Sequence, residues 1–196
     1  MNKPLRTIIL VVLAIVIVGA GAYALSTKKA LSPSSPVAEE PASDRRYTNF
    51  THDLRFTYPA GYVLTEQEVG NAERGHYQVM LVRQADAVPP VNGEGPTAVT
   101  VDIYQNDLDK RTVMDWITGT NDSNYKLGDG KLATSRVAGT EAQTYTWSGL
   151  YEGRTTVLAH EDDIIAISVT RLGEEKDLAT VYDQVLRTLE FGDFKP

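Results

Sequence analysis

Apolar and polar residues alternate along much of the chain from residue 46 onward. Leu54, Phe56 and Tyr58 are separated by polar residues, which is the two-residue period of a strand with one buried face. Similar runs follow, separated by turns rich in Gly, Pro and Asp. We predict these further strands at residues 62–65, 75–82, 97–104, 131–137, 141–148, 154–160 and 164–171. The second and third of them are expected to form a long hairpin with an exposed tip.

Two stretches have the helical period instead. Thr112 is expected to cap the first helix, with Asp115 in the place of the capping-box acid, and Trp116 should face the core. The second helix has apolar positions at i, i+3, i+4, i+7, i+8 and i+11. These are Leu178, Val181, Tyr182, Val185, Leu186 and Leu189, with Thr180, Asp183, Gln184 and Arg187 expected on the outside.

A sheet must have its apolar face covered by another layer, and the two helices are the available cover. We therefore predict the α+β class, with a mostly antiparallel sheet of six to eight strands and two helices packed on it. One N-terminal transmembrane helix and a flexible linker are expected to precede this domain. The predicted boundaries are 1–6 for a cytoplasmic N-terminus, 7–27 for the transmembrane anchor, 28–45 for a disordered linker and 46–196 for the folded domain.

Residues 7–27 carry no charged side chain and are mostly Ile, Leu, Val, Ala and Gly. In a helix, a run of this length crosses a hydrocarbon core of about 30 Å. The alternative is a cleaved signal peptide, for which Ala22-Tyr23-Ala24 would be the cleavage site. In both cases the rest of the chain crosses the membrane. We expect a single-pass protein of the cell membrane, bound to the lipid bilayer through residues 7–27, with its C-terminal domain outside the cytoplasm.

The amino-acid composition excludes several classes of function. The chain has no cysteine, so disulfides, thiolate metal sites and a thiol nucleophile are excluded. From Asp44 onward there are 15 Lys+Arg and 24 Asp+Glu, a net charge of −9. Phosphate binding depends on clustered basic residues, so no nucleic-acid partner is expected. The Ser- and Pro-rich residues 28–45 suit a spacer that holds the domain away from the membrane.

Several motifs together resemble the PsbP-like family. They are the strand Leu54-Arg-Phe-Thr-Tyr-Pro59 followed by Gly61-Tyr62, the short helix with Trp116-Ile117, and the terminal Leu186-Arg-Thr-Leu-Glu-Phe191. The order of elements over about residues 46–193 agrees with the same family. The resemblance implies a sandwich fold shared with Mog1-like proteins and a membrane-tethered, extracytoplasmic setting. It implies no single activity, and no functional residue is carried over from it.

No catalytic constellation emerges from the sequence, and no catalytic or cofactor-binding residue is assigned. Two segments combine imidazole with carboxylate, the types of ligand that divalent cations accept, namely His52-Asp53 and His160-Glu161-Asp162-Asp163. The preferred interpretation of residues 161–163 is a solvated acidic turn between two strands, so the metal site stays unknown. Gly128-Asp129-Gly130-Lys131 lacks the spacing of a phosphate loop and is interpreted as a turn before a strand.

Tyr145, Trp147 and Tyr151 form the densest aromatic group. Packing in the core or on a sheet face is one use of such a group, and an exposed partner-binding face is the other.

The sequence thus favours a membrane-tethered extracytoplasmic domain with a non-catalytic interaction or accessory role and a protein partner in the cell envelope. No cofactor is expected. One alternative is a module that binds a small ligand or a divalent cation on the acidic loops 84–96 or 161–163. A remote alternative is a hydrolase whose site the sequence does not reveal.

Overall fold

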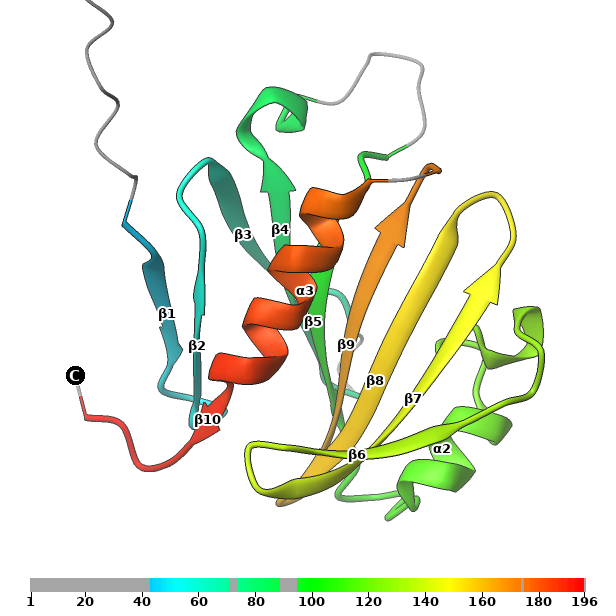
Figure 1. Ribbon diagram of the computed structural model, residues 1–196. Helices are drawn as coiled ribbons and strands as arrows, with labels where there is room; N and C mark the ends of the chain where they lie inside the picture. Colours follow the sequence, from blue (N-terminus) through cyan, green and yellow to red (C-terminus); the bar gives the residue numbers. More distant parts are fainter. Residues whose placement is uncertain (1–42, 71–73, 89–94, 174, 196) are drawn as a thin grey trace, which may run out of the picture. The chain divides into compact units, whose positions relative to one another are not determined.

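A computed structural model describes residues 43–70, 74–88, 95–173 and 175–195 (Figure 1). The predicted N-terminus (1–6), the predicted anchor (7–27) and residues 28–42 lie outside the described residues. Within the described residues, no helix is both long and apolar enough to cross a membrane.

Seven strands form the main sheet, in the order β3-β4-β5-β9-β8-β7-β6, and each neighbouring pair is antiparallel (Figure 1). They are β3 (Tyr62–Glu68), β4 (His76–Arg83), β5 (Val99–Gln105), β6 (Ala133–Val137), β7 (Thr140–Ser148), β8 (Glu152–His160) and β9 (Asp163–Arg171). The pairing of β4 with β5 confirms the predicted long hairpin. A short 3-10 helix, η1 (Gln84–Asp86), follows β4.

Three more strands form a second sheet, in the order β1-β2-β10. They are β1 (Arg45–Asn49), β2 (Leu54–Tyr58) and β10 (Glu190–Phe191). The alternation predicted in β2 is confirmed, because its three apolar side chains are buried. The sequence predicted a single sheet and did not separate β1 or β10. A two-residue strand has no period to detect, and β10 exists only because the chain returns beside Leu54 and Arg55.

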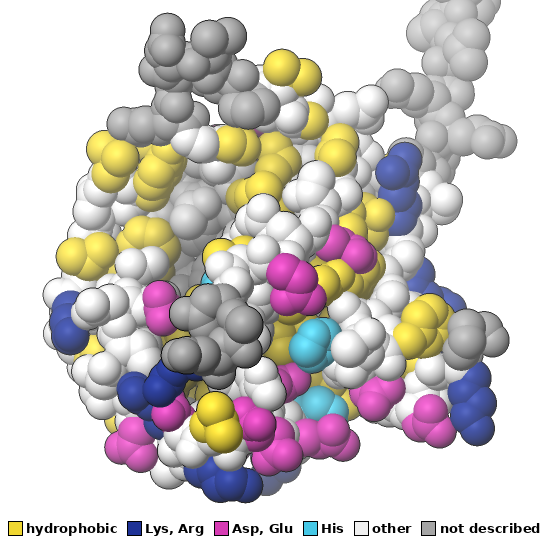
Figure 2. All heavy atoms as spheres, turned by 180° about the vertical axis from the view of Figure 1, so that it is seen from behind, with side chains coloured by type: hydrophobic (Ala, Val, Ile, Leu, Met, Phe, Trp, Pro, Cys, Tyr) yellow, Lys and Arg dark blue, Asp and Glu magenta, His cyan; other side chains and the backbone are white. Residues whose placement is uncertain are grey.

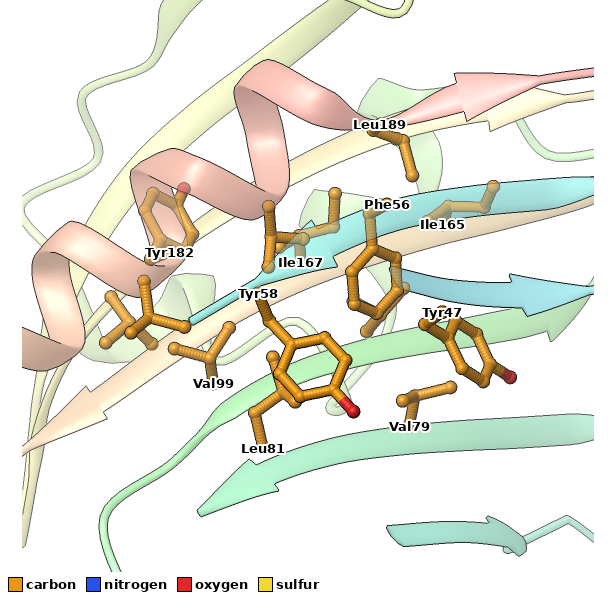
Figure 3. Packing of buried hydrophobic residues seen from close by; sticks show 14 of the residues in the cluster. Tyr47, Phe56, Tyr58, Val79, Leu81, Val99, Ile165, Ile167, Tyr182 and Leu189 are labelled. Atoms are coloured by element: carbon orange, nitrogen blue, oxygen red, sulfur yellow. The ribbon is translucent and has the colours of Figure 1, made fainter. Parts of the chain in front are cut away.

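The central strand β9 is buried on both faces. Ile165, Ile167 and Val169 point into the larger core, which β1, β2 and the long helix cover (Figure 3). Ile164 and Ala166 point the other way, into a second apolar cluster. A strand without a polar face requires a cover on each side of the sheet.

The long helix, α3 (Lys176–Thr188), covers the first face. Five of the six predicted stripe residues are buried, and Leu186 packs against them while partly exposed, so the stripe is confirmed. The hydroxyl groups of Tyr182 and Thr156 lie 2.5 Å apart, which joins α3 to β8. The prediction for Gln184 was wrong. It is buried, because strand β2 lies beside the helix and the Gln184 amide donates to Thr57 Oγ1 over 3.3 Å.

The short helix, α2 (Val113–Gly119), covers part of the opposite face. Its predicted cap is confirmed: Thr112 Oγ1 accepts from the Asp115 amide over 3.1 Å and donates to the Asp115 carboxylate over 2.7 Å. Trp116 and Ile117 are buried against β7, β8 and β9, as predicted for the tryptophan. A second 3-10 helix, η2 (Tyr125–Leu127), follows α2.

Arg83 ties the end of β4 to the start of α3. Its guanidinium bonds to Asp86 over 2.7 Å, to Thr97 over 3.0 Å and to Asp177 over 3.1 Å, and it also pairs with Glu175. Because the arginine is about three-quarters buried, these charge-assisted hydrogen bonds are only partly screened by solvent.

The same contacts shift the acid equilibria of Glu175 and Asp177. Burial alone would raise the pKa of each carboxyl group, but the hydrogen bonds and the positive charge of Arg83 outweigh burial. The pKa of each therefore lies below its usual value, which is 4.5 for Glu175 and 3.8 for Asp177. A lowered pKa in the folded state stabilises the fold above those values, and this contribution is lost as the pH falls below them.

We expect Arg83→Gln to lower the free energy of unfolding by roughly 1–3 kcal/mol at about pH 7. The difference from the parent protein should begin to shrink as the pH falls below about 4.5, and it should disappear as the pH falls through the lowered pKa values, where both carboxyl groups gain protons in the folded protein. Urea unfolding at a series of pH values measures both effects. Arg46→Gln, at an exposed arginine of β1, is the control and should change stability little. A loss in Arg83→Gln that stays constant with pH would contradict the role given to the two acids.

Candidate functional site

Two His–Asp pairs lie at the end of the sheet where β4 and β9 begin and β5 ends. His52 Nδ1 lies 3.1 Å from Asp163 Oδ2, and both side chains are about three-quarters buried. Because a carboxylate only accepts, the imidazole donates this bond. The sequence named both residues as candidates but placed them in separate segments. The structure brings them together across 111 positions of the chain.

The other histidine and acid candidates have structural roles. His160 stacks on Phe191 with 3.8 Å between ring centroids. Asp53 adopts a positive φ of 47°, and its carbonyl accepts from the Gly192 amide over 3.0 Å. Glu161 also has a positive φ and forms the turn predicted before β9. Over the described part of the chain, no group of three His, Asp or Glu side chains is arranged to hold a metal ion.

The second pair, His76 with Asp102, was not predicted. His76 Nε2 lies 2.8 Å from Asp102 Oδ1, and Gln78 Nε2 donates to the same oxygen over 2.7 Å. The Asp102 side chain is 10% exposed. The sequence did contain one sign of this pair, because Asp102 is an acidic residue within the mostly apolar run Val99–Ile103. Its partner could not be named without the register, which sets Asp102 opposite Gln78 on β4 and opposite Ala166 on β9.

The ring of His76 is the first of three neighbouring rings, which lead through Tyr104 to Trp116 of α2. His76 stacks on Tyr104 with 4.1 Å between centroids and 21° between planes, and Tyr104 lies 5.0 Å from Trp116 at 49°. Burial is the main cause that raises the pKa of Tyr104, and the negative charges of Asp102 and Asp122 raise it further. Tyr104 is therefore a neutral phenol.

Two hollows open beside these rings and share Gly75, His76 and Gln105. The first, about 360 Å³, extends to Tyr104 and Trp116. The second, about 450 Å³, extends to His52, Asp162 and Asp163. Figure 2 shows this face of the molecule, with histidine and acidic side chains gathered at its lower end and apolar side chains toward its upper end.

The arginines at this end of the sheet are paired with acidic side chains. Arg74 binds both carboxylate oxygens of Asp109, and Arg111 Nε lies 3.4 Å from the same carboxylate. Together with Asp122, these residues give the walls of the first hollow two positive and two negative charges.

The aromatic group singled out in the sequence packs in the core. Tyr145 and Trp147 are 2% and 8% exposed, and Trp147 Nε1 donates to Thr155 Oγ1 over 3.0 Å. Tyr151 is partly exposed, and its hydroxyl donates to the Gly95 carbonyl over 2.8 Å. The packing interpretation is therefore confirmed for Tyr145 and Trp147.

The remaining candidate loops give no site. Residues 89–94 of the acidic loop 84–96 lie outside the described residues, and Asp86 is paired with Arg83. The Gly128–Lys131 segment is the predicted turn before β6, where Lys131 Nζ binds Asp129 over 2.7 Å.

Replacing Asp102 tests what the carboxylate does. Asp102→Ala leaves two partly buried donors, on His76 and Gln78, unpaired, so we expect a loss of about 1–3 kcal/mol in the free energy of unfolding. The proton of His76, now held on Nε2, should redistribute between the two ring nitrogens, which ¹⁵N NMR of the imidazole measures. Asp102→Asn keeps an acceptor and should lose less stability. An unchanged imidazole spectrum in Asp102→Ala would contradict this positioning role.

Comparison with known proteins supports the fold. No protein-family model and no curated protein sequence matches this chain. The solution structure of cyanobacterial PsbP (CyanoP) from Synechocystis is similar, with 16% sequence identity and a TM-score of 0.51 over 83% of this chain and 99% of that chain. The Ran-binding protein Mog1p of Saccharomyces cerevisiae is 14% identical, with a TM-score of 0.42 over 76% and 96% of the two chains. At these identities a likeness concerns architecture alone, and the similarity to cyanobacterial PsbP shows that the chain has the PsbP-like fold that its sequence resemblance implied.

Proposed function

We propose that this protein is a membrane-tethered, extracytoplasmic domain with a non-catalytic interaction or accessory role toward a protein of the cell envelope. Residues 7–27 supply the apolar segment for the tether, and residues 28–45 supply a spacer. The acidic domain is repelled by anionic lipid headgroups, which favours a tethered domain held away from the bilayer over one that lies on it.

The observation that carries the interaction role is a pair of exposed leucines at the tip of the β7–β8 hairpin. Leu150 is 69% exposed and Leu127, from η2, is 52% exposed. The Leu127 side chain lies against Gly149, the residue before Leu150: its Cδ1 atom is 3.6 Å from where a Cβ of Gly149 would be. We call Leu127 and Leu150 the leucine patch.

The surroundings of the leucine patch suit a protein contact. A hollow of about 320 Å³, lined in part by Leu127, Trp147 and Arg171, adjoins the patch. Nε of Arg171 is buried without a hydrogen-bond partner among the described residues. Apolar side chains beside an arginine are typical of the centre of an interface, where an arginine contributes strongly once water is excluded.

The His76–Asp102 pair does not carry a hydrolase proposal. A serine- or threonine-type mechanism requires a hydroxyl that donates to the imidazole. In the first hollow, the hydroxyl of Thr120 donates instead to the Trp116 carbonyl over 2.9 Å.

The tether predicts a defined topology. In bacterial cells that express the full chain, protease added to spheroplasts should digest the folded domain, and fractionation should place the intact chain in the membrane. Deletion of residues 7–27 is the matched control and should make the domain inaccessible to the protease. A full-length chain that stays protected and fractionates with the soluble proteins would overturn the tether.

The leucine patch predicts a local effect on partner binding. Leu127→Ser together with Leu150→Ser should reduce the yield of a cross-linked envelope partner by about tenfold, since each buried leucine at an interface contributes on the order of 1 kcal/mol or more. Thermal unfolding should change little, because both side chains are exposed.

Leu108→Ser is the control for this experiment. Leu108 is 75% exposed, like the patch, but it follows β5 at the opposite end of the sheet. The partner yield should stay at the parent level in Leu108→Ser. Equal yields from all three proteins would exclude the leucine patch as the contact surface.

A further inference from the structure

Strand β6 forms one edge of the main sheet and pairs on one side only, with β7 (Figure 1). Among the described residues, no other strand pairs with its outer side. Four of its five residues are exposed, and only Val137 is buried. An open edge of a sheet presents backbone N–H and C=O groups to which another strand can bind.

The turn after β6 shows which of its residues bond to β7. Ala138 and Gly139 form a two-residue turn with φ values of 51° and 78°, the left-handed values of a tight hairpin turn. In such a hairpin Val137 and Thr140 exchange both backbone hydrogen bonds. Pairs of this kind alternate along antiparallel strands, so every second residue of β6, counted back from Val137, also bonds to β7.

The residues between them, Thr134 and Arg136, direct their backbone N–H and C=O groups to the outer side of β6. Their side chains lean away from that side. Thr134 Oγ1 donates to Gln143 Oε1 on β7 over 3.2 Å, and Arg136 Nη1 donates to the Gly139 carbonyl in the turn over 3.0 Å. The outer side therefore offers two backbone donors and two backbone acceptors.

A second copy of β6 fits these groups in an antiparallel register centred on Ser135. In this register Thr134 lies opposite Arg136 of the second copy, and the two residues exchange two backbone hydrogen bonds. The two-fold axis repeats this pair, so all the outward groups of both strands find partners. A self-complementary contact about a two-fold axis is the commonest way in which identical chains associate.

The charges of β6 permit this register. Arg136 is the charged residue of the strand, and in the register it lies opposite a threonine. On the inner side its partner across β7 is Glu141, which offsets its positive charge. No two like charges are directly opposite one another, which is the arrangement that destabilises strand pairs.

The other edge of the main sheet, β3, carries charges that oppose the same kind of pairing. The Val69 amide donates to the His76 carbonyl over 2.7 Å. The alternation from this bond directs the backbone groups of Glu66 and Glu68 outward. A symmetric pair centred on Gln67 would place Glu66 opposite Glu68 of a second copy, and like charges repel there. Strand β3 therefore has a protection against self-pairing that β6 lacks.

We propose that two copies of this chain pair through β6, so that their two main sheets join into one continuous sheet. The contact consists mainly of backbone hydrogen bonds and buries few apolar side chains. It therefore belongs to the small, weak class of interfaces, and the dimer forms where the local concentration of the chain is high.

This surface is separate from the leucine patch. Strand β6 pairs with residues 140–144 of β7, whereas the patch lies beyond Ser148, at the other end of β7. Pairing through β6 therefore requires neither the leucine patch nor its partner.

Because the chain has no cysteine, single cysteines can test the register. In the proposed dimer the two Ser135 residues form a non-hydrogen-bonded pair with about 4.5 Å between their Cα atoms, a separation that a disulfide bridges. The Ser135→Cys full chain is purified in mild detergent at about 100 µM, which populates weak dimers. Oxidation with copper phenanthroline should convert it to a disulfide-linked dimer.

Two other single-cysteine variants are the controls. Thr134→Cys lies off the two-fold axis, where the two Cα atoms would be more than about 7 Å apart and beyond the reach of a disulfide. Gln67→Cys lies at the centre of the acidic edge β3. Each control should give at least about fivefold less dimer than Ser135→Cys in the same time.

A proline separates edge pairing from folding. Thr134→Pro removes one outward N–H, while the hydrogen bonds between β6 and β7 do not use that group. Added to Ser135→Cys, it should lower the yield of dimer at least about fivefold, with cooperative thermal unfolding retained. Glu66→Pro, at an outward N–H of β3, is the matched control and should leave the yield unchanged. If the Thr134→Pro chain does not fold, the three single-cysteine variants still decide the question.

The proposal is overturned if Ser135→Cys stays monomeric, including when another protein binds the edge instead. It is also overturned if the three single-cysteine variants cross-link equally, or if the dimer persists in a folded Thr134→Pro chain. None of these results bears on the tether or the leucine patch, because the purified chain needs neither a membrane nor a partner in this experiment.

Discussion

The structure depends on the burial of β9 on both of its faces. Ile165 and Ile167 need one cover and Ile164 needs another, so the sheet is stable only between two layers. One cover is large and consists of α3 with the small β1-β2-β10 sheet. The other is small, because α2 has only two turns. Because α2 covers only part of its face, the rest of that face can carry polar side chains.

On the side of α2, the polar residues lie where the helix does not reach. Asp102 and Gln78 share a row with Ala166, and His76 shares the next row with Tyr104 and Ile164. Towards β9 these rows are apolar and covered, and towards β4 they are polar, with His76 and Tyr104 lining the hollow. The site is therefore the uncovered part of the second core, and its polar groups can have partners only from their own row, from solvent or from a ligand.

The sequence predicted the features that depend on neighbouring residues. The strand alternation, the Thr112 cap and the α3 stripe are local patterns with known periods, and the structure confirms them. The prediction that Gln184 lies on the outside of α3 was wrong, because its side chain is buried beside Thr57, which is 127 positions away in the chain. For the same reason the His76–Asp102 and His52–Asp163 pairs were not predicted as pairs: strand register sets the first and a loop-to-strand contact the second, and neither follows from the spacing of the residues.

The two ends of the sheet differ in chemistry because of this architecture. At the β7–β8 turn, Leu150 lies beyond the last paired residues, Ser148 and Glu152, and is 69% exposed. At the other end, the row of His76 continues into buried rings and so ends in a hollow with directional polar groups. An apolar patch suits a broad protein surface. The exposed leucines and the hollow beside α2 therefore lie at opposite ends of the sheet, so a molecule that contacts one leaves the other open.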